Sequence, residues 1–427
     1  MRNEALLAPS QLAPACEAGP EGEVIPFDVA SAKALAVAAP VSRRERLSIL
    51  EATGRILSAT VRSAIDLPPF DNSAMDGYAV RSADLQGSGP WVLKVGQRVA
   101  AGETAHGVAQ PGGVAVRILT GAPIPKGFDS VLMQERCERR DDHIIVMDAP
   151  RVGQNIRRAG EDIESGQVAA ETGAELTPQL LALLAGQGRA YVDVIGKVRV
   201  GLLSTGNELR DPGEALGSGQ IYNSNRIAIR AALARCAWAD VIDFGIVRDR
   251  RDLLVDAIGE AAGKCDALIT TGGASAGEED HVAAAITTCG GELDVLKVAM
   301  RPGKPVKIGF VGPTLLAALP GNPNAAFVTF RQIAFPALRA MAGLASPKLE
   351  WHPGVAGFSY EKRLGHTEFV PVEIVGSDNF GRPVLSMLGK GSSASLRAMS
   401  LAQGIARLPP GTPSVSPGDS LQFDRIA

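Results

Sequence analysis

The chain contains 427 residues, of which 45% are hydrophobic, 21% charged and 4% aromatic, and its formal net charge is −3. The small net charge and the scarcity of aromatic rings argue against a nucleic acid or an anionic membrane as a partner, and no apolar run approaches the roughly 18 residues that cross a bilayer. The length predicts about three domains, and five cysteines without C-x-x-C spacing argue against a structural zinc site or a disulfide framework and favour a reducing, cytoplasmic compartment.

The N-terminal third is expected to contain a leader, a helical segment and a β-rich segment. Residues 1–24 predict a disordered leader, because Pro9 and Gln11 interrupt the apolar stretch that a signal peptide needs. Residues 28–58 carry apolar side chains three and four apart on both sides of a proline, which predicts two helices. From about residue 60 to 150, short β-rich runs broken by Gly and Pro predict a β module.

One stretch of this β module lacks a regular period. Residues 68–80, PPFDNSAMDGYAV, contain the turn-forming sequences Asp-Asn-Ser and Asp-Gly, and their apolar and polar residues alternate poorly. On composition alone, the stretch is expected to be an ordered surface loop that builds no regular element.

Strands and helices then alternate along the chain. Thr177 and Pro178 predict the start of a short helix that ends at Gly186. From residue 196, the strands VRVGLL, ADVIDFGIV and ALITT alternate with the helices SNRIAIRAALARC and RDLLVDAIGEAAGKC. This alternation predicts a three-layer α/β domain with a parallel-type sheet. After about residue 347 the pattern is again typical of β structure.

Three loops follow predicted strands of the α/β domain. They are STGNEL (204–209), TTGGASAGEEDH (270–281) and LPGNPNAA (319–326). Ligands of open α/β sheets bind outside the carboxyl ends of the strands, where backbone N–H groups favour anions. The loops therefore predict a site for a phosphorylated ligand, with ordinary tight turns as the alternative. Neither the dinucleotide fingerprint nor the P-loop pattern is present.

Charged side chains accompany these loops. Carboxylates beside a phosphate usually hold Mg²⁺, because like charges need a bridging cation; the alternative is that they are solvated loop acids, which is favoured for Glu278 and Glu279. Arg301 and Lys304 flank a Pro-Gly turn and would suit a tetrahedral oxyanion or a phosphate, although alone they would more often form an exposed basic turn.

Several motifs together resemble the molybdenum insertase, or molybdopterin molybdenumtransferase, family. In that family's order they are DLPPFDNSAMDGYAV, RILTGAPIP, NIRRAGEDI, LLSTGNEL, IYNSN, ITTGGASAGEED, MRPGKP and LPGNP. They run from about residue 25 to 330, and DNSAMDGYA combined with GGASAGEED is highly specific. The closing segment LAQGIARLPPGTPSVSPGDSL resembles the family's last domain more loosely.

The resemblance implies a multi-domain fold of α/β and β parts. The expected parts are a leader (1–24), a discontinuous helical linker domain (25–60 and 157–195), an inserted β module (61–156), a three-layer α/β domain of the molybdopterin-binding type (196–346) and a C-terminal β-barrel (347–427). It also implies a homodimer with the site between one subunit's α/β domain and the other's β module. Transient partners would be molybdopterin adenylyltransferase and molybdoenzyme apoproteins.

The implied reaction takes adenylylated molybdopterin and molybdate, places the metal in the dithiolene and hydrolyses off AMP with Mg²⁺. Asp249 and Asp280 are expected metal ligands, and Asp71, Asp162 and Glu208 are expected catalytic groups, of which Glu208 or Asp71 can orient water. The expected contacts to pterin, phosphates and molybdate are Asn72, Ser73, Thr120, Gly121, Thr205, Gly272, Gly273, Ser275, Arg301, Lys304, Pro320, Gly321 and Asn322.

Departures from the family gather around the expected molybdate pocket. Arg301 stands where Lys is common, and Asn324 and Ala325 stand where the family usually has Val-Ser. His366 and Pro371 stand where it tends to place arginines. These changes remove one hydroxyl and up to two fixed cations, whereas the pyrophosphate side is kept.

Two other functions stay open. A non-catalytic carrier of molybdopterin or of finished cofactor on the same scaffold would retain binding without an oxyanion site. A molybdopterin adenylyltransferase resembles the α/β domain alone, although its reaction would not need the β module.

Overall fold

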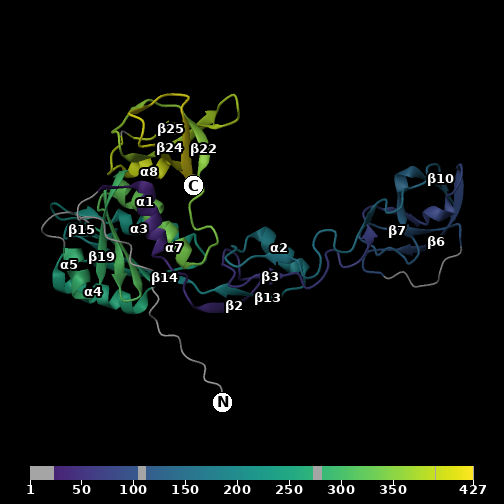
Figure 1. Ribbon diagram of the computed structural model, residues 1–427, viewed down its shortest axis with the longest axis horizontal. Coiled ribbons are helices and arrows are strands. Elements are labelled where there is room, and N and C mark those ends of the chain that lie inside the picture. The colour runs from purple at the N-terminus through teal and green to yellow at the C-terminus, as the bar shows by residue number, and fades with distance from the viewer. Residues whose placement is uncertain (1–23, 104–111, 273–280, 390, 427) are drawn as a thin grey trace, which may run out of the picture. The chain divides into compact units, whose positions relative to one another are not determined.

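The computed structural model describes residues 24–103, 112–272, 281–389 and 391–426 (Figure 1). The chain divides into two compact units, each described by itself below. The first comprises Met1–Glu45, Gly54–Ser58 and Val194–Ala427, and the second comprises Arg46–Thr53 and Ala59–Asp193. The finer division into five parts remains a prediction.

A mixed sheet lies at the centre of the first unit, with the strand order β17-β14-β18-β21-β20-β19 in its α/β part. The strands are β14 (Val198–Thr205), β17 (Ala239–Val247), β18 (Ala267–Thr271), β19 (Glu292–Arg301), β20 (Pro305–Val311) and β21 (Thr314–Leu319), with β1 (Val24–Pro26) beside β19. The first four strands in this order are parallel, whereas β20 is antiparallel to both neighbours. All five residues of β18 are buried, as expected for a sheet covered on both faces.

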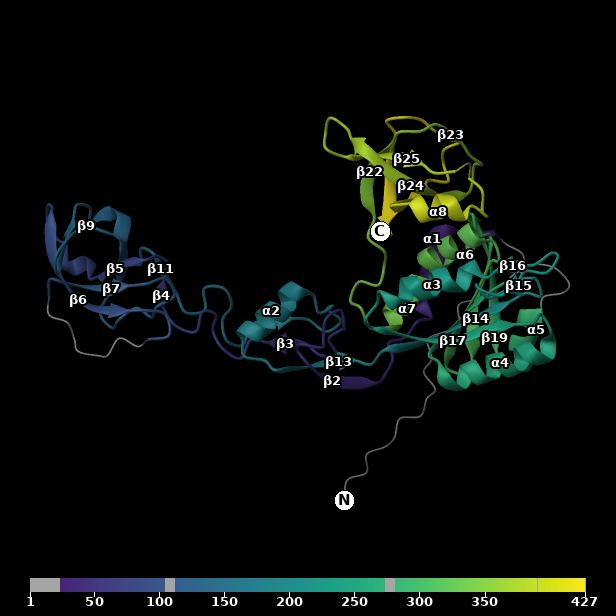
Figure 2. The same ribbon diagram turned by 180° about the vertical axis from the view of Figure 1, so that it is seen from behind.

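Helices cover both faces of this sheet (Figures 1 and 2). One face carries α1 (Phe27–Ala36), α3 (Ser224–Ala234), α6 (Pro323–Thr329), the π-helix η3 (Phe330–Ala334) and α7 (Phe335–Met341), and the other carries α4 (Arg251–Lys264) and α5 (His281–Thr288). Leu254, Ile258 and Ala261 of α4 are fully buried in one hydrophobic cluster with sheet residues. The predicted three-layer α/β domain and the apolar stripe of α4 are therefore confirmed.

A closed five-stranded barrel forms the C-terminal part of the first unit. Its strands are β22 (His352–Ala356), β24 (Thr367–Ser377), β25 (Pro383–Met387), β26 (Gly404–Leu408) and β28 (Ser420–Arg425), accompanied by β23 (Tyr360–Glu361), α8 (Leu396–Leu401) and β27 (Ser414–Val415). Ladders β24–β25, β25–β22, β22–β28, β28–β26 and β26–β24 complete the circle. The expected barrel is thus confirmed. It joins the α/β sheet because β19 pairs with β24, placing Met300 beside Thr367 and Arg301 beside Glu368.

The second unit contains a six-stranded sheet of order β8-β5-β7-β6-β10-β9. Its strands are β5 (Gly77–Val80), β6 (Trp91–Val99), β7 (Val114–Ile118), β8 (Ser130–Met133), β9 (Cys137–Arg140) and β10 (His143–Val146). Its smaller elements are β3 (Val61–Arg62), β4 (Asn72–Ser73), η1 (Ser82–Asp84), η2 (Gln134–Arg136), β11 (Ile156–Arg157), β12 (Val168–Ala170) and α2 (Pro178–Gly186). The strands β2 (Arg44–Ser48) and β13 (Tyr191–Ile195) each have residues in both units, and β15 (Leu209–Arg210) pairs with β16 (Ile221–Tyr222) in the first unit. The predicted short helix is confirmed as α2, because Thr177 Oγ1 accepts the Leu180 N–H at 3.2 Å.

Two local expectations are wrong. Only the first of the two helices predicted in residues 28–58 forms, because β2 pairs with β13 and so takes up the second segment. The stretch 68–80 is not wholly irregular, since it contains β4 and β5. In both segments, hydrogen bonding to strands distant in sequence produces β structure that the local sequence pattern does not predict.

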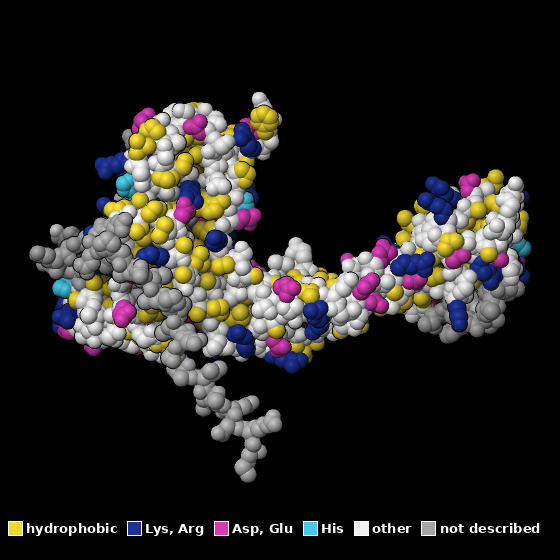
Figure 3. All heavy atoms as spheres, in the orientation of Figure 1, with side chains coloured by type: hydrophobic (Ala, Val, Ile, Leu, Met, Phe, Trp, Pro, Cys, Tyr) yellow, Lys and Arg dark blue, Asp and Glu magenta, His cyan; other side chains and the backbone are white. Residues whose placement is uncertain are grey.

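Residues 1–23 of the predicted leader lie outside the described residues. No helix in the described ranges is long and apolar enough to cross a membrane. Basic and acidic side chains are interspersed on the face seen in Figure 3, as the small net charge predicts.

Candidate functional site

The carboxyl ends of β14, β18 and β21 meet at one edge of the sheet in the first unit. The chain leaves β14 for β17 on one side and returns to β18 on the other, and a ligand crevice is expected where the strand order reverses in this way. A Cβ added to Gly272 would lie 2.3 Å from the carbonyl oxygen of Thr205, and one added to Gly321 would lie 4.0 Å from the Gly272 Cα. The structure therefore brings the beginnings of the three predicted loops together.

Buried polar atoms without partners lie along this edge. Within the described ranges, Thr205 Oγ1, Thr270 Oγ1 and Asp249 Oδ1 have no hydrogen-bond partner. The loop of Asp249 is tied to the loop after β14, because its N–H donates to Asn207 Oδ1 at 3.2 Å. Buried polar groups in proteins are almost always bonded, so these atoms indicate a place for a polar ligand or a cation.

The predicted metal ligands are only partly described. Asp280, together with Gly273 and Ser275, lies in the segment 273–280, outside the described residues. In the rest of the described chain, no three or more His, Cys, Asp or Glu side chains gather closely enough to hold a metal ion. The buried Oδ1 of Asp249 fits one ligand of a hard cation such as Mg²⁺, which prefers carboxylate oxygens. Glu208 is exposed.

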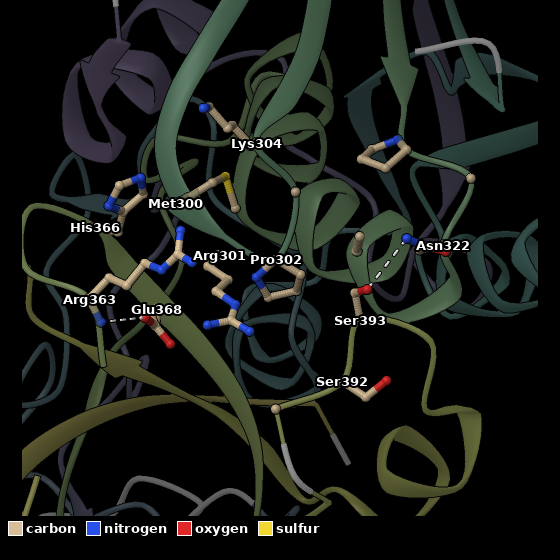
Figure 4. Close-up of a pocket in the computed structure, with 15 residues that line it drawn as sticks. Met300, Arg301, Pro302, Lys304, Asn322, Arg363, His366, Glu368, Ser392 and Ser393 are labelled. Carbon is tan, nitrogen blue, oxygen red and sulfur yellow. Dashed lines mark hydrogen bonds between the residues drawn. The ribbon is translucent and has the colours of Figure 1, made fainter. Parts of the chain in front are cut away.

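A pocket of about 630 Å³ lies between the β19–β20 turn, the loop after β21 and the C-terminal barrel (Figure 4). Arg301 and Lys304 line it from the turn, and Pro320, Gly321 and Asn322 line it from the loop. These five predicted residues thus share one cavity, which reaches the carboxyl end of β21.

The barrel contributes further pocket residues, and of those named here only His366 was expected at the pocket, through the family resemblance. Arg363 and His366 come from the segment between β23 and β24, and Ser392 and Ser393 come from the segment before α8 (Figure 4). Ser393 Oγ lies 3.4 Å from Asn322 Nδ2, which donates to it. For Arg363, Ser392 and Ser393, the sequence signals are the Lys-Arg pair before a Gly-turn and the Ser-Ser pair before a short helix.

The family departures have different structural outcomes. Ala325 lines the pocket, and the hydroxyls of Ser392 and Ser393 lie in the same cavity. His366 lines the pocket too, whereas Pro371 is buried in β24 of the barrel, where it pairs with Ile405. Only one of the two expected cation losses therefore falls in the pocket.

A buried carboxylate lies beside the cations of the pocket. Glu368 is only 2% exposed, and its Oε2 accepts the Tyr360 hydroxyl at 3.0 Å while its Oε1 accepts the Arg363 N–H at 3.2 Å. Burial, reinforced by the hydrogen bond to Glu368, raises the pKa of Tyr360, so Tyr360 stays a neutral donor. The cations Arg301 and Lys304 are exposed at the rim.

In the second unit, Asp71 is held ionised. Its carboxylate accepts the Ala159 N–H at 2.8 Å and the Arg158 guanidinium at 2.5 Å. These two bonds, the backbone one first, hold the pKa of Asp71 below its usual value. Asp162 is exposed, and its N–H donates to the Leu67 carbonyl at 2.9 Å.

The remaining predicted residues of this unit bond within their own loops. Asn72 Nδ2 donates to the Phe70 carbonyl at 3.2 Å, and the fully buried Ser73 Oγ donates to the Met75 carbonyl at 2.6 Å.

Two neighbours complete this loop. Thr120 donates through both its N–H and its Oγ1 to Asp76, at 2.8 and 2.7 Å, and these bonds hold the pKa of Asp76 below its usual value. The N–H of Gly121 donates to the Ser73 carbonyl at 2.8 Å. The roles of these residues toward a ligand remain predictions.

Three family descriptions match almost the whole chain. They are the MoeA N-terminal region (domain I and II) at residues 25–188, the probable molybdopterin binding domain at 201–340 and the MoeA C-terminal region (domain IV) at 353–424.

Similar proteins agree with these matches. A molybdopterin molybdenumtransferase of Haemophilus influenzae is 39% identical over 348 residues, covering 81% of this chain and 85% of that one. Molybdopterin molybdenumtransferase 2 of Mycobacterium tuberculosis is 35% identical over 391 residues, covering 88% and 93%. The crystal structure of a molybdopterin biosynthesis moeA protein from Pyrococcus horikoshii OT3 matches with a TM-score of 0.80 and 26% identity, covering 95% of this chain and all of that one.

Proposed function

This chain belongs to the molybdopterin molybdenumtransferase family, and we propose that it is a transferase of molybdenum cofactor biosynthesis that inserts molybdate into adenylylated molybdopterin, with Mg²⁺-dependent release of AMP. One observation carries the proposal. The loop 320–322 follows β21 at the edge of the sheet where the predicted loops meet, and it also lines the cationic pocket. A phosphorylated pterin at the edge and an oxyanion in the pocket would therefore be neighbours.

The sheet edge would bind the pyrophosphate of the substrate. Gly272 leaves no Cβ between the ends of β14 and β18, so the phosphate can approach the backbone closely. The partnerless hydroxyl of Thr205 would donate to a phosphate oxygen. Asp249 and Asp280 would hold Mg²⁺, which when bound neutralises pyrophosphate charge. Glu208, exposed on the first loop, would orient the attacking water.

The pocket would bind molybdate. Arg301, Lys304 and Arg363 place positive charge around the cavity, which attracts a tetrahedral dianion. Ser392 and Ser393 supply hydroxyl donors in a cavity where the family's usual hydroxyl is replaced by Ala325. Hydroxyls from the barrel would thus donate the hydrogen bonds that the family's usual serine hydroxyl would donate.

The second unit would act from another subunit of a cytoplasmic homodimer. Asp71 and Asp162 would then be its catalytic contributions, with Asn72, Ser73, Thr120 and Gly121 forming the surface that meets the substrate. Molybdopterin adenylyltransferase and molybdoenzyme apoproteins would deliver the substrate and receive the product. The ionised state of Asp71 supports this role, because a base must be deprotonated to orient water.

The test is reconstitution from purified components. The full chain is mixed with adenylylated molybdopterin, Mg²⁺ and molybdate, and both AMP release and activation of a molybdoenzyme apoprotein are measured. Both should occur, and both should fall at least about tenfold in Arg301→Met, since charge-assisted anion contacts are lost. Arg140→Met is the matched control and should behave as wild type, because the Arg140 side chain is 67% exposed on β9, the edge strand of the second unit's sheet.

Three outcomes would contradict the proposal. AMP release without apoprotein activation would exclude insertion. Tight binding of the substrate without molybdate-dependent AMP release would indicate the carrier instead. Formation of adenylylated molybdopterin from ATP and molybdopterin would indicate the adenylyltransferase.

A further inference from the structure

The segment that carries Arg363 and His366 to the pocket is held from inside by a buried lysine. Lys362 is 9% exposed. Its Nζ donates to the carbonyl oxygens of Arg363, His366 and Thr412, each at 3.1 Å. A lysine ammonium has three N–H donors, so these three carbonyls use all of them.

The geometry of these bonds defines a small closed turn. Two of the acceptors, the carbonyls of Arg363 and His366, lie on either side of Leu364 and Gly365, and Gly365 has a φ of +80° that favours glycine. The third acceptor, the Thr412 carbonyl, anchors the turn to the barrel. The backbone adds to this anchor, because the Gly365 N–H donates to the Pro410 carbonyl at 3.0 Å.

The backbone N–H of Arg363 is also held in place. Its N–H donates to Glu368 Oε1 at 3.2 Å, and Glu368 belongs to β24, which pairs with the strand that ends at Arg301. Arg363 is thus fixed through its carbonyl by Lys362 and through its N–H by Glu368. Its exposed side chain is left to enter the pocket (Figure 4).

We propose that Lys362 is a positioning residue for the oxyanion pocket, in that its ammonium group fixes the turn that presents Arg363 and His366. This inference rests on the proposed function, which assigns the pocket to molybdate. Lys362 itself does not line the pocket wall described above; it acts through the backbone of the two residues that do.

The charge of Lys362 suits this role. Burial lowers the pKa of Lys362, while the negative charge of Glu368 acts in the opposite direction. A neutral amine would have only two N–H donors for three carbonyls, so the protonated form is the one that closes the turn. A buried charge is expensive unless it is hydrogen-bonded, and here each bond contributes to the position of the turn.

The first experiment measures molybdate binding to the full chain by titration calorimetry. Lys362→Met keeps the stem length and removes the donors, so the Kd for molybdate should rise at least about tenfold, because a displaced cation no longer meets the oxyanion. The Kd for AMP, a probe of the sheet edge, should stay within about twofold. Lys264→Met is the control, since that lysine is 58% exposed on α4 and pairs with Glu260.

A second set of variants separates positioning from general stability. If Lys362 acts through Arg363, the Kd of the double variant Lys362→Met/Arg363→Met for molybdate should lie within about twofold of the Kd of Arg363→Met. Independent effects of the two substitutions would instead multiply. Lys362→Gln keeps two N–H donors and should bind molybdate with an intermediate Kd. It replaces Lys362→Met in the experiment if that variant is too unstable to purify.

The outcomes distinguish this inference from the function on which it rests. Wild-type molybdate binding that survives in both Lys362 variants would overturn the inference and leave the function standing. Equal losses of AMP and molybdate binding would also overturn it, because they would indicate a merely structural role. A wild-type chain that binds AMP but no molybdate would overturn both.

Discussion

Replacing Gly272 by alanine should damage both the folding of the first unit and the nucleotide binding proposed for its sheet edge. Gly272 has a φ of +87°, and an L-residue in a left-handed conformation costs about 1–2 kcal/mol. The new Cβ would lie 2.3 Å from the Thr205 carbonyl oxygen, which is well inside ordinary van der Waals contact. Because that oxygen belongs to the backbone of β14, the strands must shift, at an overpacking cost of about 1–3 kcal/mol. The two effects together predict a loss of about 2–5 kcal/mol.

The measurements are urea unfolding and calorimetric binding of AMP. The shift of β14 also displaces the Thr205 hydroxyl, so AMP binding should weaken at least about tenfold in Gly272→Ala. Gly259→Ala on α4 is the matched control, because nothing lies within 4 Å of its new Cβ. In a helix interior this change should stabilise the protein by about 0.5–1 kcal/mol. A Gly272→Ala protein as stable as wild type, with unchanged AMP affinity, would refute the reasoning.

Three further predictions concern separate parts of the chain. Ile258→Ala empties a fully buried position on α4 and should cost about 2–5 kcal/mol in chemical unfolding. Asp266, although burial alone would raise its pKa, has a lowered pKa because Arg43 and Arg199 donate to it. The pKa of Asp266 in the folded protein lies below the unfolded value of about 3.9. The stabilisation that ionised Asp266 gives the folded state is therefore present above that pH and is lost as the pH falls through the folded pKa. The difference in unfolding free energy between wild type and Asp266→Asn should therefore shrink as pH falls below about 4. Asp71→Asn should slow AMP release about 100-fold or more while changing unfolding free energy by less than about 1 kcal/mol, since its ion pair is exposed; an unchanged rate would remove Asp71 from the catalytic role.

The α/β part was predictable because its signals are local and agree with one another. Continuous apolar strands such as β18, the stripe on α4 and the Thr177 cap each specify an element without reference to distant residues. The second helix predicted in residues 28–58 does not form, because Arg44–Ser48 pairs with a segment more than a hundred residues away, which its local pattern does not reveal.

The candidate site also has a part that the sequence predicts and a part that it does not. Thr205, Gly272 and Gly321 could be assigned to one place because the carboxyl ends of neighbouring parallel strands must meet. Arg363 and Ser393 could not, because they reach the pocket only after the barrel has closed and docked beside β19. Barrel closure depends on ladders between distant segments, which leave no periodic signal at the residues they deliver.

The edge of β19 has a consequence for how the protein is made. Two strands cover that edge one after the other: β1 pairs with it at Lys297–Ala299, and the first residues of β24 pair with it at Met300 and Arg301. During synthesis, β1 must therefore wait for most of the chain to emerge before it finds its partner, and β24 emerges later still. Until β24 has emerged, the edge of β19 at Met300 and Arg301 stays open to other nascent chains. We expect late, length-dependent folding of the first unit on the ribosome, and aggregation of chains truncated before residue 367.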